Sequence, residues 1–138
     1  EQYEAGATMI RLGWGSTNPA YRHFFTSTFM PHATAAQSDS FDELQRLCVT
    51  TDNALKIWKM NSVVDVSNLA SKITVPTLVL HYRGDRVVPM EEGRRMAAMI
   101  PGAQFIQLEG DNHIPLEGSP GFDELFETID RFVGEHAD

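Results

Sequence analysis

Two short apolar runs in the second half of the chain, each followed by a polar loop and an amphipathic segment, constrain the fold most. The first run, residues 77–82, is followed by Gly84 and Asp85. The second run, residues 104–108, leads into a loop that ends at His113. Because alternating strands and helices are typical of parallel sheets, this order predicts a β-α-β-α unit of an α/β fold.

Both helices of this unit have start and stop signals. Residues 90–100 carry two glutamates in the first turn, where the positive end of the helix dipole favours them, and Pro101 follows as a terminator. The second helix is predicted to start at a Ser119 cap and to stop at Gly134. Its apolar residues recur on one helical face: Phe122, Leu125, Phe126, Ile129, Phe132 and Val133.

Asp85 and His113 follow successive strands, and reactive groups of parallel sheets gather in the loops beyond the carboxyl ends of the strands. Imidazole titrates near neutral pH, and a carboxylate on its other nitrogen fixes the tautomer and stabilises the imidazolium. The pattern therefore predicts a catalytic pair, with His113 as base and Asp85 as orienting acid. Asp111 is the alternative acid, but it lies two residues before His113 and would have to fold back on it.

At residues 75–81, 84–89 and 111–113 the chain resembles the C-terminal half of the α/β-hydrolase family. The resemblance is most specific over residues 73–135. Such proteins carry a nucleophile, an acid and a histidine in that chain order, with the nucleophile on a strand-to-helix elbow. The resemblance implies acyl hydrolysis, as in esterases and lipases, through a Ser-His-Asp triad that needs no cofactor and acts on a small-molecule substrate with an ester or related acyl bond.

The resemblance also implies two regions. Residues 1–72 would form a helical cap or lid, and residues 73–138 would form the C-terminal part of the hydrolase core. By the same resemblance, four residues are candidates to line the substrate pocket: Val87, Ile114, Trp58 and Met30. For Trp58 and Met30 the alternative is simple packing between helices, which is the more frequent use of large apolar side chains.

The nucleophile elbow, Gly-x-Ser-x-Gly, does not occur in the 138 residues. Ser16 lacks the flanking glycine spacing, Ser119 has the context of a helix cap, and Cys48 lies on an apolar helical face and is predicted to be buried. We therefore expect the nucleophile upstream of this chain, in a missing N-terminal half of the hydrolase fold. The chain would then be a fragment that is inactive alone.

Residues 11–15, 18–19 and 91–95 are similar to bacterial hydrolase-like domains, some of which are fused to cyclase or transcription-regulator modules. This similarity supports an alternative function, a non-catalytic sensory or interaction module that binds a small molecule or a partner. Related folds also use an aspartate nucleophile or transfer acyl groups, and the acid and histidine do not distinguish among these reactions.

The first 72 residues are predicted to be helical. An aromatic face, Tyr21 to Phe29, ends before Pro31, as expected where proline follows a helix. Ser40 has the capping-box spacing for a second helix, whose Leu44, Leu47 and Cys48 would form a buried face, and Thr51 or Asp52 could cap a third.

The net charge of −8 makes nucleic acid an unsuitable partner, because the polyanion would be repelled. A single cysteine, no signal peptide and no apolar span predict a cytoplasmic protein that does not enter the membrane. No metal or cofactor signature is present. Since the strand at residues 77–82 would lack neighbours on one side, we also expect self-association.

Overall fold

The computed structural model describes residues 2–137, with only the main chain of Gln2, and divides into two compact units. The first unit extends to Asp65 and the second begins at Val66. Each is described by itself. Among the residues described, no helix is both long enough and apolar enough to cross a bilayer.

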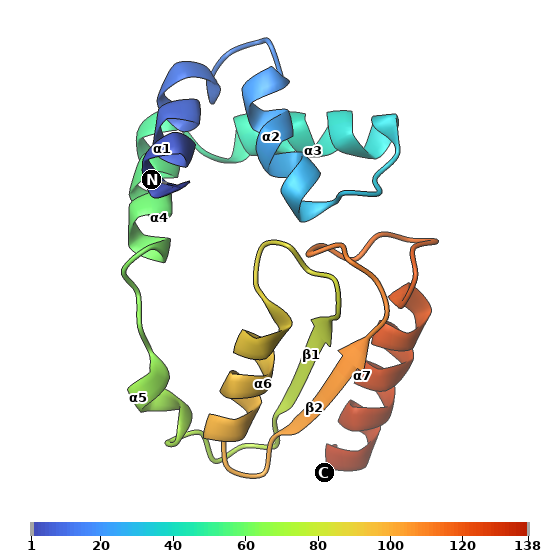
Figure 1. Cartoon of the computed structure of the whole chain (residues 1–138). Helices are drawn as coiled ribbons and strands as arrows, with labels where there is room; N and C mark the ends of the chain where they lie inside the picture. Colours follow the sequence, from blue (N-terminus) through green and yellow to red (C-terminus); the bar gives the residue numbers. More distant parts are fainter. Residues whose placement is uncertain (1, 138) are drawn as a thin grey trace. The chain divides into compact units, whose positions relative to one another are not determined.

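The first unit is formed by helices (Figure 1): α1 (Gln2–Gly13), α2 (Ala20–Phe29), α3 (Ala35–Cys48) and α4 (Thr51–Asn61). Ile10, Phe25 and Ala54, from three of these helices, form its buried apolar core. The Phe25 ring packs edge-on against Trp14 and Trp58, with centroids 5.8 and 5.7 Å apart. Edge-to-face aromatic packing therefore contributes to holding α2 against α4 and against the residue that follows α1.

The helix starts differ partly from those predicted. The helix α2 does end before Pro31, with Met30 as its C-cap residue. The helix α3 begins at Ala35, not near Ser40, because Thr34 and Gln37 form a complete capping box with the same spacing earlier in the chain. Thr50 caps α4, one residue before the predicted cap.

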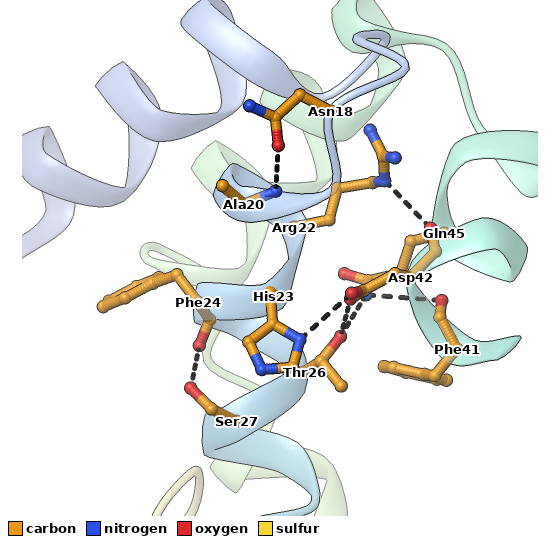
Figure 2. A network of polar contacts seen from close by, with 10 residues as sticks. All are labelled: Asn18, Ala20, Arg22, His23, Phe24, Thr26, Ser27, Phe41, Asp42 and Gln45. Atoms are coloured by element: carbon orange, nitrogen blue, oxygen red, sulfur yellow. Dashed lines mark hydrogen bonds and ion pairs between the residues drawn. The ribbon is translucent and has the colours of Figure 1, made fainter. Parts of the chain in front are cut away.

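The predicted buried face of α3 is wrong. Leu44 and Leu47 are 51% and 68% exposed, and Cys48 is exposed as well. The helix instead buries Ser38 and Asp42, because the α2 side that it packs against presents polar groups. Figure 2 shows this polar network, in which the Asp42 carboxylate accepts hydrogen bonds from Thr26 and His23 of α2: the hydroxyl of Thr26 and, at 3.1 Å, Nδ1 of His23.

The second unit has the predicted β-α-β-α order after one short helix (Figure 1). Its elements are α5 (Ser67–Ala70), β1 (Leu78–Tyr82), α6 (Met90–Met99), β2 (Gln104–Leu108) and α7 (Phe122–His136). The two strands are parallel, with Leu78 opposite Gln104 and Tyr82 opposite Leu108. Within residues 2–137, β1 has a strand neighbour on one side only.

The bounds of α7 correct two predictions. Gly121, with φ of 75°, is the N-cap residue, and the Ser119 hydroxyl donates to the carbonyl of Leu116 rather than capping the helix. A Cβ at position 121 would overlap the carbonyl oxygen of Glu109, so the turn requires glycine. The helix continues through Gly134 to His136, because an interior glycine costs a helix only about 1 kcal/mol.

Candidate active site

The parallel pairing of β1 and β2 brings the two loops that follow them to one edge of the sheet. Main-chain hydrogen bonds from Arg83 N to Leu108 O (2.9 Å) and from Gly84 N to Gly110 O (2.8 Å) continue the pairing beyond the strands. A Cβ at Gly84 would lie 2.7 Å from the Cβ of Asp111, so the loops can approach this closely only because residue 84 is glycine.

Asp85 and His113 meet at this edge. His113 Nδ1 lies 2.7 Å from Oδ2 of Asp85, and the side chains are 34% and 5% exposed. Because an ionised carboxylate only accepts, Nδ1 must donate, which fixes the tautomer of a neutral ring. Nε2 is then its basic nitrogen. The Nδ1 partner is thus Asp85, not the alternative acid Asp111.

The loop of Asp85 also satisfies the second oxygen of its carboxylate. Oδ1 accepts hydrogen bonds from the main-chain amides of Val87 (2.7 Å) and Val88 (3.1 Å). Burial by itself raises the pKa of Asp85, but the hydrogen bond from His113, the two amides and the charge of His113 together bring that pKa below its ordinary value. Asp85 is therefore an anion at neutral pH.

A second histidine lies beside the pair. His81, the fourth residue of β1, has Nε2 2.9 Å from the carbonyl oxygen of Val88 and 3.7 Å from Oδ2 of Asp85, and its side chain is 10% exposed. The sequence predicted only a structural strand residue here. The one sequence signal for a role of His81 at the site was its position four residues before Asp85. That spacing does not reveal that the loop folds back over the strand.

A cavity of about 450 Å³ opens beside these residues and is mainly apolar. Its wall includes Asp85, His113 and His81, with Met96 of α6 and Leu125 of α7. An apolar cavity with a few convergent polar groups is the usual form of a small-molecule site.

The four predicted pocket residues are placed differently. Val87 and Ile114 are half-buried, but their neighbours Val88 and Pro115 line the cavity. Trp58 packs on the core of the helical unit and donates Nε1–H to the carbonyl of Tyr3 at 2.9 Å. Met30 is buried. Contact of any of the four with a substrate stays a prediction.

The described residues hold no group of three or more His, Cys, Asp or Glu side chains arranged to bind a metal ion. Two further histidines have partners within their own units. His23 contacts Asp42 in the helical unit, and His136 contacts the carbonyl of Phe132 within α7.

Comparison with known proteins gives concordant results. An α/β-hydrolase family model described as TAP-like protein matches residues 46–129, more than half of the chain. Two curated proteins named "Putative carbamate hydrolase RutD", from Pseudomonas syringae and Pseudomonas savastanoi, are 36% and 32% identical over 63 residues. Each match covers 46% of this chain and 24% of the relative.

Solved structures show the same fold. An esterase from Exiguobacterium antarcticum superimposes with a TM-score of 0.77 at 18% identity, over 99% of this chain and 48% of the esterase. A hydrolase from Oleispira antarctica gives 0.75 at 15% identity, over 94% and 46%. The chain thus spans about half the length of these structures and has part of their fold. On the evidence of the family match and of this shared fold, the chain belongs to the α/β-hydrolase family.

Proposed function

We propose that Asp85 and His113 are the acid and the base of a hydrolase triad that cleaves an acyl bond in a small molecule. The observation that carries this proposal is the 2.7 Å contact between His113 Nδ1 and the buried carboxylate of Asp85. A buried acid on Nδ1 leaves Nε2 as the nitrogen that exchanges protons with a nucleophile and a leaving group.

In the proposed reaction, a serine hydroxyl from outside these 138 residues attacks the carbonyl carbon. His113 Nε2 accepts the hydroxyl proton and later delivers it to the leaving group. Asp85 stays ionised and stabilises the imidazolium that forms between these steps. Main-chain amides, also from outside this chain, would bind the oxyanion. Without that half of the site the 138-residue chain is expected to be inactive.

The substrate proposed is an ester or a carbamate. The esterase named above shares the fold, and the curated relatives are named for carbamates. Both bonds present a carbonyl carbon to the same nucleophile, so one triad serves either. The mainly apolar wall of the cavity favours an uncharged substrate.

The two regions of the chain are proposed to correspond to the cap and the core of the family fold. Residues 1–72 would be the cap and residues 73–138 the C-terminal part of the core. The structure separates its compact units between Asp65 and Val66, so α5 belongs with the second unit. The edge of β1 that has no strand neighbour within residues 2–137 would receive the strands of the remaining hydrolase sheet.

The test uses the longest reading frame that contains this chain, expressed as one protein. Hydrolysis of p-nitrophenyl acetate and of a p-nitrophenyl carbamate is measured for wild type, His113→Ala and Asp85→Asn. We expect a loss of about 10⁴-fold in kcat for the aspartate variant and at least as much for the histidine variant. His136→Ala, in the last residue of α7, is the matched control and should keep full activity.

Circular dichroism would verify that every variant is folded. Wild-type activity in folded His113→Ala would disprove the proposed base. A folded wild type that binds esters without turnover would instead favour the sensory alternative.

A further inference from the structure

His81 forms one hydrogen bond with the main chain and lies beside the Asp85 carboxylate. Its Nε2 lies 2.9 Å from the carbonyl oxygen of Val88, and a carbonyl can only accept, so Nε2 must carry the proton. The Nδ1 side of the ring packs on Gly93 of α6. A Cβ at Gly93 would lie 2.5 Å from Nδ1 of His81, so the helix leaves room for this ring only because residue 93 is glycine. The ring orientation is therefore held from two sides.

Val88 is bound at both ends of its main chain. Its amide donates to Oδ1 of Asp85 at 3.1 Å, and its carbonyl accepts from His81. These two contacts connect the His81 ring to the Asp85 carboxylate through one residue. The direct distance from His81 Nε2 to Asp85 Oδ2, 3.7 Å, is too long for a hydrogen bond. The hydrogen-bonded connection from His81 to the acid therefore runs through Val88.

From this geometry we infer that His81 is a positioning residue: by holding Val88, it fixes the turn of residues 85–88 so that Oδ2 of Asp85 faces Nδ1 of His113. The catalytic consequence rests on the proposed function, whereas the positioning itself does not. Without the His81 donor, the peptide group between Val88 and Pro89 would lose its hydrogen bond, and a rotation of Val88 would then take its amide away from Oδ1 of Asp85.

Three substitutions of His81 distinguish a hydrogen-bonding role from a role in packing alone. His81→Gln keeps an N–H at about the position of Nε2. His81→Leu fills a similar volume without a donor. His81→Asn keeps a polar amide that is too short to reach the Val88 carbonyl, and it carries the test if the leucine variant does not fold.

The first readout is NMR of the 138-residue chain, which requires no activity. Carbon-13 spectra follow the titration of the Asp85 carboxyl, and long-range proton–nitrogen spectra report the tautomer of His113. In the leucine and asparagine variants we expect the pKa of Asp85 to shift up and the Nδ1–H form of His113 to lose population. The glutamine variant should match wild type. Unchanged spectra for folded leucine or asparagine variants, or an equal change for glutamine, would overturn the inference.

The second readout is kinetics of the longer protein. Loss of the donor should lower kcat by about 10²-fold and change KM little. A displaced acid affects the transition state more than it affects substrate binding. Glutamine should restore kcat. If His113→Ala is fully active, the proposed function fails, yet the NMR result still decides whether His81 positions Asp85. An unchanged kcat beside a shifted NMR signal would disprove only the catalytic consequence.

Discussion

Arg22 and Asp42 meet in the interior of the helical unit through a main-chain oxygen: Nε of Arg22 donates to the carbonyl of Asp42 at 2.9 Å. The same guanidinium also reaches the carbonyls of Trp14 and Ser16, at 2.7 and 2.6 Å, and so closes the turn between α1 and α2. The Asp42 carboxylate accepts instead from Thr26. Buried polar groups thus connect α1, α2 and α3.

The Thr26 hydroxyl should therefore be important for stability. It donates to Asp42 and accepts from Gln45, so Thr26→Val leaves buried polar atoms without their partner. We expect a loss of about 1–3 kcal/mol in the free energy of unfolding, measured by urea denaturation. Thr28→Val is the matched control, because the Thr28 hydroxyl donates to the carbonyl of Phe25 within its own helix. Equal losses for both variants would contradict a special role for Thr26.

The Asp85 carboxylate should make the second unit sensitive to acid. The pKa of Asp85 in the folded state lies below its pKa in the unfolded chain. The ionised carboxylate therefore makes its full contribution to stability above about pH 4. That contribution is lost as the pH falls through the folded pKa. Asp85→Asn should therefore lose less stability than wild type between pH 7 and pH 3. Asp130→Asn, at an exposed position of α7, should behave like wild type in the same urea titrations.

Gly121 should not tolerate a side chain. Gly121→Ala adds a Cβ that overlaps the Glu109 carbonyl and crowds the Tyr82 ring, in addition to the strain of a φ of 75°. Gly118→Ala is a matched control, because residue 118 has a φ of 78° with open space around it. The left-handed strain costs roughly 1–2 kcal/mol at either position, so the difference between their melting temperatures measures the overlap. Equal melting temperatures would mean that the turn relaxes without cost.

The open edge of β1 should promote self-association of the 138-residue chain. Strand edges present unpaired N–H and C=O groups, and within residues 2–137 β1 pairs only with β2. Light scattering over a concentration series should show a rising average mass. Val75→Lys, which places a charge just before the strand, should reduce that rise. A constant monomer mass at high concentration would contradict the prediction.

Local patterns predicted the α/β unit well, because loops that follow successive parallel strands must leave the same edge. The meeting of Asp85 with His113 follows from that rule. Burial in the helical unit was less predictable. The α3 face with Leu44 and Leu47 had the apolar spacing, but burial there is decided by the long-range contacts of Asp42. His81 was missed since its partner depends on how a loop folds back.

The main-chain bonds from Arg83 and Gly84 to the loop after β2 have a consequence for redesign. These main-chain hydrogen bonds, rather than contacts between loop side chains, set the distance between Asp85 and His113. Exposed neighbours such as Arg86 and Glu109 can then be exchanged to alter the surroundings of the pair while its spacing is preserved. The outer surface of the two loops is thus open to variation, whereas the main-chain hydrogen bonds between them must be kept.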